Sequence, residues 1–206
     1  MSERAFENVL DVYKKRIAAE SALAATLSPE EQSARRDEFL LEIGEEVARF
    51  LSALVIGLDA KIVVEVGTSY GYSTLFLADA ARTTGGRLYT YELSREKQAF
   101  AKNRLAEARL GEYVEWILGD ATEMIEQQPG PIDFALIDLW KDLYIPCFEK
   151  IYPKLAATGV VVADNMLHPE VFREHAAAYR AAVRAKPDME GVLLRMGNGI
   201  DVSSRR

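Results

Sequence analysis

The chain has 206 residues, a formal net charge of −7, one cysteine and 49% hydrophobic residues. That length supports a single domain over residues 1–206 with a full hydrophobic core, and the charged fraction of 28% excludes wholesale disorder. No apolar run approaches the roughly 18 residues that a membrane span needs. The acidic balance argues against broad binding of a phosphate backbone. Cys147 cannot form an internal disulfide, which favours a cytoplasmic location.

Residues 1–60 are predicted to be helical, and they carry most of the negative charge, with 7 basic and 12 acidic side chains. Ser28-Pro29-Glu30-Glu31 is a capping box with proline at the first helical position. Beyond it, apolar residues at three- and four-residue steps predict one amphipathic helix that ends near Gly57. These residues are Phe39, Leu40, Ile43, Val47, Phe50, Leu51 and Leu54.

Residues 61–206 alternate between short apolar runs and helical stretches, which predicts an α/β core. The predicted strands are 61–66, 87–91, 113–118, 132–137 and 159–163, and the first two predicted helices extend to Ala81 and over 95–109, closed by Gly111. Residues 192–194 and 200–203 predict a closing antiparallel hairpin. This alternation indicates a doubly wound three-layer sandwich with a mostly parallel, seven-stranded sheet, in which ligands bind at the carboxyl ends of the strands.

The first predicted strand ends in a turn with two glycines, Gly67 and Gly71. Glycine lets the backbone approach a ligand closely, and free N–H groups of the next helix favour a carboxylate or phosphate. The nicotinamide-cofactor pattern G-x-G-x-x-G and the Walker lysine are both absent. The spacing E-x-G-x-x-x-G, starting at Glu65, resembles motif I of class I S-adenosylmethionine (SAM)-dependent methyltransferases. An ordinary tight strand–helix turn is the alternative.

The second and third predicted strands also end in residues suited to a nucleoside. Glu92 ends the second strand, 25 residues after Gly67, where a carboxylate can accept from both hydroxyls of a ribose. Gly119-Asp120-Ala121 ends the third strand, where the methyltransferase family places the adenine. Alternatively, Glu92 is an exposed residue before a helix, and Asp120 is a helix N-cap with Glu123 completing a capping box.

The fourth and fifth predicted strands end in Asp138 and in Asp164-Asn165. If these strands are neighbours, two carboxylates and an amide oxygen converge within about 5–10 Å. Such oxygen ligands suit octahedral Mg²⁺ with positions left for water and substrate, whereas zinc would favour His or Cys. Lys141 follows Asp138 by three residues. Capping of the following helices is the alternative role for both aspartates.

These motifs together resemble the cation-dependent O-methyltransferases of the catechol and caffeoyl-coenzyme A type, over about residues 36–204. The resemblance implies that Asp138, Asp164 and Asn165 hold a divalent metal and that Lys141 is the general base. It also implies a SAM site with S-adenosylhomocysteine (SAH) as product. The implied cofactor-binding residues are Ile43, Glu65, Gly67, Thr68, Tyr70, Gly71, Ser73, Glu92, Gly119, Asp120, Ala121, Asp138 and Trp140.

Within that set, Glu92 would bind the ribose, Ser73 and the turn at Gly67 the methionine carboxylate, and Trp140 would lie against the adenine. Ile43 would contact the methionine portion. Packing in the core or at the rim explains Tyr70 as well as a contact with the cofactor does.

The resemblance implies methyl transfer to a small molecule with adjacent hydroxyls, catechol-like or hydroxycinnamoyl-type. Two departures affect the acceptor end. Leu139 replaces a histidine of the animal catechol enzymes, and no glutamate follows Glu190 to hold the second hydroxyl, for which Asn198 and Asp201 are weak substitutes. The alternatives are methylation of a hydroxylated tRNA base and a non-catalytic SAM-binding module. A homodimer is expected, and residues 1–60 would form either a lid or a dimer contact.

Overall fold

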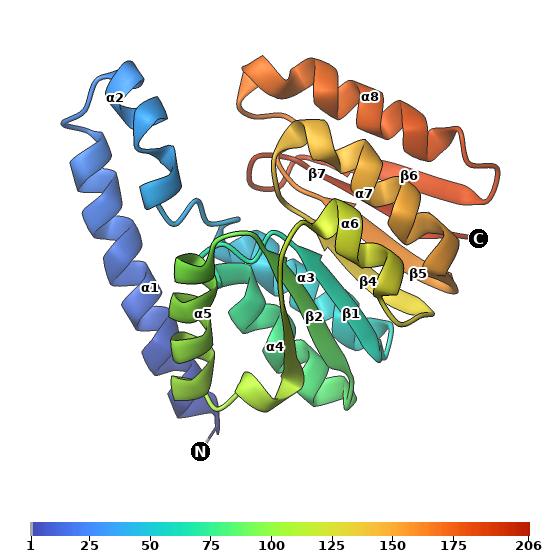
Figure 1. The fold of residues 1–206 in the computed structure, drawn as a ribbon, viewed down its shortest axis with the longest axis horizontal. Helices are drawn as coiled ribbons and strands as arrows, with labels where there is room; N and C mark the ends of the chain where they lie inside the picture. The colour runs from blue at the N-terminus through green and yellow to red at the C-terminus, as the bar shows by residue number, and fades with distance from the viewer. Residues whose placement is uncertain (1) are drawn as a thin grey trace.

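The computed structural model describes residues 2–206 and places one seven-stranded sheet between two layers of helices (Figure 1). The strands are β1 (Ile62–Val66), β2 (Arg87–Glu92), β3 (Val114–Leu118), β4 (Ile132–Ile137), β5 (Leu155–Ala163), β6 (Met189–Leu194) and β7 (Ile200–Arg205). The helices are α1 (Ser2–Ala24), α2 (Pro29–Ala34), α3 (Glu45–Gly57), α4 (Tyr72–Thr84), α5 (Arg95–Glu107), α6 (Ala121–Met124), α7 (Tyr144–Ile151) and α8 (Arg173–Arg184).

The strand order is β3-β2-β1-β4-β5-β7-β6. Strands β3 to β5 pair in parallel, and β7 is antiparallel to both of its neighbours. The predicted doubly wound sandwich with a closing hairpin is therefore confirmed. The chain leaves β1 first toward β2 and later returns to β4 on its other side, so the topological switch point lies between β1 and β4, where open α/β sheets bind ligands.

Alternate strand residues face opposite helical layers, as a period of two requires. Val63 packs in a core with α1, α3, α4 and α5, whereas its neighbour Val64 packs in a second core with α6, α7 and α8. Figure 1 shows the same division, with α1 beside α5 on one side and α7 beside α8 on the other. Both faces of the central strands β1 and β4 are buried, which explains why their sequences are almost continuously apolar.

The prediction of one helix from Ser28 to Gly57 is wrong. The capping box at Ser28 forms, but it starts only the short helix α2, and the chain then makes a 3₁₀ turn, η1 (Arg36–Glu38), and runs irregularly before α3. Leu40 is buried in that irregular part, and its N–H donates to the Glu20 carboxylate at 2.7 Å. Apolar residues at helical spacing are thus buried here by a segment that is not helical. We call residues 36–43 the N-terminal strap.

A smaller difference concerns the C-terminal end of α5. Helix α5 ends at Glu107, two residues before the predicted end. Arg109, with φ of +60°, adopts the left-handed conformation near the helix end, and Gly111 begins a 3₁₀ turn instead of closing the helix.

Among residues 2–206, none of the helices combines the length and the apolar character needed to cross a membrane.

Candidate active site

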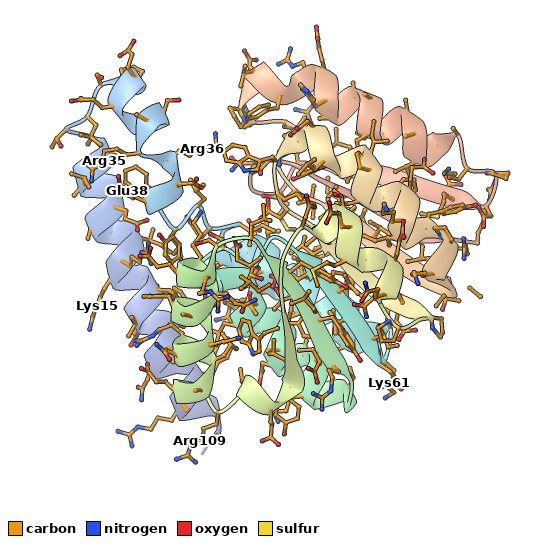
Figure 2. The ribbon with its side chains drawn as sticks, in the orientation of Figure 1. Lys15, Arg35, Arg36, Glu38, Lys61 and Arg109 are labelled. Carbon is orange, nitrogen blue, oxygen red and sulfur yellow. The ribbon has the colours of Figure 1, made fainter. Side chains whose placement is uncertain are left out.

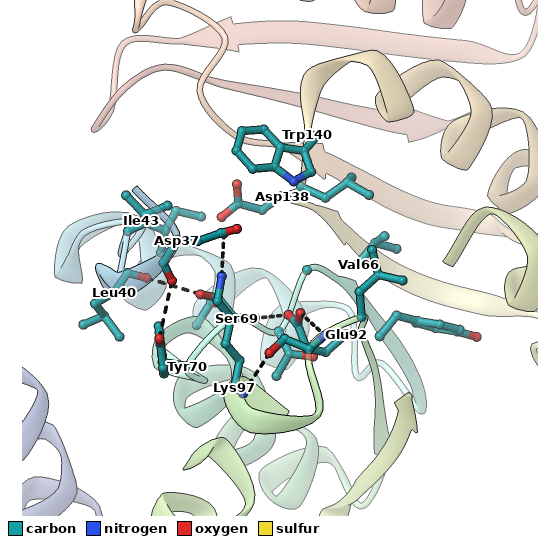
Figure 3. A pocket seen from close by; sticks show the side chains of 18 of the residues that line it. Asp37, Leu40, Ile43, Val66, Ser69, Tyr70, Glu92, Lys97, Asp138 and Trp140 are labelled. Carbon is teal, nitrogen blue, oxygen red and sulfur yellow. Dashed lines mark hydrogen bonds and ion pairs between the residues drawn. The ribbon is translucent and has the colours of Figure 1, made fainter. Parts of the chain in front are cut away.

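The carboxyl ends of β1, β2, β3 and β4 open into one cavity of about 750 Å³, which the N-terminal strap also lines (Figure 3). The cavity brings together most of the predicted site residues. These are Ile43, Gly67, Thr68, Tyr70, Ser73, Glu92, Gly119, Asp120, Ala121, Asp138, Trp140, Lys141 and Asn165. Three predicted residues, Glu65, Gly71 and Asp164, do not line its wall and lie behind it.

Gly67 is required where β1 meets the end of β4. It has φ of +107°, and a Cβ atom there would lie 1.9 Å from the backbone oxygen of Asp138. The N–H groups of Gly67 and Thr68 both donate to the Tyr91 carbonyl at 3.1 Å. The turn itself therefore has few donors left for a ligand, and the available N–H groups are those of the first turn of α4, at Tyr72 and Ser73.

Glu65 lies under this turn and is fully buried. Its carboxylate accepts hydrogen bonds from the hydroxyls of Ser73, Thr74 and Thr90 at 2.6–2.7 Å. Burial raises the pKa of Glu65 to about 7 despite these three donors. Glu65 therefore fixes the start of α4 against β1 and β2, and any effect it has on a ligand passes through Ser73.

Glu92 is held rigidly at the end of β2. One carboxylate oxygen accepts from the Ser69 N–H at 2.7 Å, a bond drawn in Figure 3, and the other accepts from the Ser94 N–H at 2.8 Å. Each carboxylate oxygen has two acceptor sites, so both oxygens can still receive a ribose hydroxyl. The geometry therefore suits a carboxylate that binds a diol without reorganising.

The end of β3 contributes a short wall to the cavity. Asp120 caps α6 by accepting from both the N–H and the hydroxyl of Thr122, at 2.8 and 2.7 Å. Asp120 is thus the N-cap of α6. Its side-chain bonds come from Thr122 and not from Glu123, so the predicted capping box with Glu123 is wrong. Gly119 has φ of +151°, and a Cβ there would lie 2.3 Å from the sulfur of Met124, so the close packing of this wall depends on glycine.

The ends of β4 and β5 bring the predicted metal ligands to neighbouring positions. Ile137 pairs with Ala163, so the next residues, Asp138 and Asp164, lie side by side at the edge of the sheet. The Asp164 N–H donates to the Ile137 carbonyl at 3.2 Å, and Asn165 turns the chain with φ of +54°.

Lys141 lies in the 3₁₀ turn η4 (Lys141–Leu143), is 7% exposed, and points toward these ligands. Its Nζ donates to the Asn165 amide oxygen at 2.8 Å and to the Tyr144 hydroxyl. Burial lowers the pKa of Lys141, while the charges of Asp138 and Asp164 oppose that shift. The structure thus places an amine that is easier to deprotonate than usual beside two carboxylates.

The two aspartates fit a divalent cation. The Oδ1 atom of Asp164 is buried and has no hydrogen-bond partner among the described residues. Burial and the charge of Asp138 raise the pKa of Asp164 to about 8, and burial also raises the pKa of Asp138. Within residues 2–206, no three His, Cys, Asp or Glu side chains are arranged to hold a metal ion, so the set depends on Asn165 as the third oxygen donor.

Two groups in this site were not predicted from the sequence. Tyr144 links the Lys141 ammonium to the Asp164 carbonyl, to which its hydroxyl donates at 3.2 Å. The spacing Lys141-x-x-Tyr144 could have indicated this pair, because residues three apart share a helical face. The strap is the second group: Asp37 pairs with Lys97 at 2.8 Å, and Leu40 accepts from Ser69 (Figure 3).

Known proteins resemble this chain in both sequence and fold. The O-methyltransferase family model matches residues 18–205. A probable O-methyltransferase of Mycobacterium tuberculosis is 30% identical over 73% of this chain, and the match spans 66% of the relative, slightly under two thirds of its length. A catechol O-methyltransferase of Niastella koreensis is 30% identical over 62% of this chain and 59% of its own length.

Among solved structures, the O-methyltransferase from Bacillus cereus in complex with SAH aligns with a TM-score of 0.77 at 23% identity, covering 98% of this chain and 91% of that one. The Streptomyces achromogenes O-methyltransferase TomG in complex with SAM aligns with a TM-score of 0.75 at 24% identity, over 84% and 86% of the two chains. These likenesses establish the fold. Together with the match over residues 18–205, they show that the chain belongs to the O-methyltransferase family.

Proposed function

We propose that this chain transfers the methyl group of SAM to one of two adjacent hydroxyls on a small aromatic molecule, with Mg²⁺ bound beside the acceptor. The observation that carries the proposal is the buried Lys141, held by Asn165 and Tyr144 beside Asp138 and Asp164. This cluster opens into the same cavity as motif I. A module that only bound SAM would need neither a buried base nor a paired set of carboxylates.

In this proposal the cofactor occupies the ends of β1 to β3. Glu92 accepts from the ribose hydroxyls, and the first turn of α4, with Ser73, binds the methionine carboxylate, which the helix dipole also favours. Trp140, 48% exposed at the mouth, covers the adenine, and Ile43 in the strap contacts the methionine chain.

Asp138, Asp164 and Asn165 would hold the metal, which when bound makes a coordinated hydroxyl easier to deprotonate. Lys141 would accept the proton from the acceptor hydroxyl, and its lowered pKa makes it easier to deprotonate than an ordinary lysine. The acceptor oxygen then attacks the methyl carbon as the carbon–sulfur bond breaks, which leaves SAH. Asn165 and Tyr144 hold the lysine in the structure, and Tyr144 would keep it oriented when the Asn165 oxygen binds the metal.

Relatives named for catechol and for caffeoyl-CoA support a small-molecule acceptor. The strap carries Asp37, Glu38 and Glu42 at the cavity rim, which is an unfavourable surface for a tRNA backbone.

We further propose a cytoplasmic homodimer. The reduced, buried Cys147 is consistent with the compartment, and light scattering of the purified protein tests the dimer.

The test is methyl transfer from labelled SAM to catechol, with and without EDTA. We expect transfer that stops in EDTA and returns with Mg²⁺, and that is lost in Asp138→Ala. Activity that survives both EDTA and Asp138→Ala would overturn the metal assignment. SAH binding without transfer to any catechol, hydroxycinnamoyl thioester or tRNA acceptor would instead support a binding module.

A further inference from the structure

Arg36 spans the mouth of the cavity from the N-terminal strap. Its guanidinium carbon lies 5.5 Å from the ring centre of Trp140 and 5.9 Å from that of Phe172, two residues on the opposite wall. Figure 2 shows Arg36 on the side of the strap that faces the α7–α8 half of the molecule, whereas Arg35 lies on the side of α1. The cation thus sits at the acceptor end of the cavity.

Arg36 forms no ion pair among residues 2–206, although its charge acts on the buried Asp138 and opposes the rise that burial causes in the pKa of that carboxyl. Its buried Nε lacks a hydrogen-bond partner within the same range. The acids beside it in sequence are engaged elsewhere: Asp37 pairs with Lys97, and Glu38 pairs with Arg35, each at 2.8 Å. A buried donor without an acceptor is costly, which indicates that a ligand completes this site.

The surroundings of Arg36 fit a flat, singly charged ligand. Phe172 provides an aromatic face next to a planar guanidinium, a combination that binds an aromatic ring and its carboxylate together. Trp140, which covers the adenine in the proposed function, borders the same guanidinium. A polyanion fits poorly, because Glu38 and Glu42 lie at the same rim. Pro169 and Phe172 line the same cavity as Arg36 and Asp138.

We propose that Arg36 binds the carboxylate of the methyl acceptor, so that the preferred acceptors are aromatic acids with two adjacent hydroxyls rather than neutral catechols. This inference rests on the proposed function for the position of the hydroxyls. The diol end lies at Asp138 and Lys141, and the acid end lies under the strap. The strap residue therefore determines acceptor specificity without taking part in the methyl transfer.

The test compares matched acid and ester acceptors. Wild type, Arg36→Met and Arg35→Met are assayed with 3,4-dihydroxybenzoate, 3-(3,4-dihydroxyphenyl)propanoate and the methyl ester of each. Arg35 is the matched control, because it is the adjacent arginine and is already paired with Glu38. We expect wild type and Arg35→Met to prefer an acid over its ester in kcat/KM by about tenfold or more, as a charge-assisted pair provides. Arg36→Met should lose that preference, with the change in the acceptor KM and not in the SAM KM.

A binding measurement separates this inference from the proposed function. Calorimetric titration of the SAH-loaded, Mg²⁺-containing proteins with the two acids should give a dissociation constant at least about tenfold weaker for Arg36→Met than for Arg35→Met. Binding that depends on Arg36 without methyl transfer would contradict the proposed function alone. An acid preference that persists in Arg36→Met, acids that fail to bind wild type, or tighter binding of the esters would overturn the role of Arg36.

Discussion

The half of the cavity that we propose binds the cofactor, at the ends of β1 to β3, differs from the proposed acceptor half, at the ends of β4 and β5 and under the strap. In the cofactor half, Glu65, Glu92 and Asp120 each accept at least two hydrogen bonds from the protein. In the acceptor half, one Asp164 oxygen and the Arg36 Nε are buried and unpartnered within residues 2–206. The polar groups of the first half are paired within the protein, and we propose that ligands complete the second half.

This difference separates what each half must do. A site that only binds gains from groups fixed in advance, because little entropy is lost when the ligand arrives. A site that moves a proton needs groups whose charge state can change. Lys141 and Asp164 are such groups, because burial shifts the pKa of each and the other interactions do not cancel that shift. Substitutions in the two halves should therefore affect different measurements.

The largest expected effect is in the acceptor half. Lys141→Met should lower kcat by about 10²- to 10⁴-fold, the usual contribution of a general base. SAH affinity should stay within about twofold, because the cofactor half is intact. Lys150→Met is the control, since Lys150 pairs with Glu126 away from the cavity. A Lys141→Met enzyme with near wild-type kcat would show that another group takes the proton.

A backbone substitution tests how rigid the cofactor half is. Gly67→Ala should lower the free energy of unfolding by more than about 3 kcal/mol, because its Cβ would overlap the Asp138 carbonyl. Gly85 also has a positive φ, of +67°, but open space around it, so Gly85→Ala should cost only about 1–2 kcal/mol. Urea unfolding of both variants measures the difference. Equal losses would mean that φ alone, and not the contact with β4, requires glycine at position 67.

Glu65 should make the free energy of unfolding depend on pH. Its pKa is about 7 in the folded protein and near 4.5 when exposed, so between those values the folded state keeps a proton that the unfolded chain has released. The free energy of unfolding should therefore fall as pH rises through that window, by roughly 3 kcal/mol at about 1.4 kcal/mol per unit.

Glu65→Gln should remove that part of the pH dependence, so the stability difference between wild type and variant should change by most of this amount, about 2–3 kcal/mol, between pH 5 and pH 8. Urea unfolding of the ligand-free proteins at both values measures it. A difference that stays constant with pH would contradict the raised pKa.

The sequence was sufficient to predict the sheet, because its short apolar runs have the length and spacing of strands. It also predicted the edge where the site lies, because these runs end in Gly67, Glu92, Asp138 and Asp164 and parallel strands bring such ends to one edge. It was not sufficient for the strap. Leu40 and Ile43 have helical spacing, yet they are buried by an irregular segment that Glu20 and Ser69 hold by hydrogen bonds.

Arg36 was missed for a related reason. It lies in an acidic, helix-like region where a charged residue is normally solvated, and only the fold reveals that its neighbours pair with other partners. Long-range pairing of this kind leaves no local pattern, since Asp37 and Lys97 are 60 residues apart.

The claim that ligands complete the acceptor half is tested most directly by thermal unfolding with and without Mg²⁺. In the presence of SAH, Mg²⁺ at about 100 times its dissociation constant should stabilise the wild type by about 2.7 kcal/mol. Asp164→Asn should lose that stabilisation and, without Mg²⁺, should be at least as stable as the wild type, because an amide can be buried without first taking up a proton. A wild type that does not respond to Mg²⁺, or an Asp164→Asn protein that responds equally, would contradict this account.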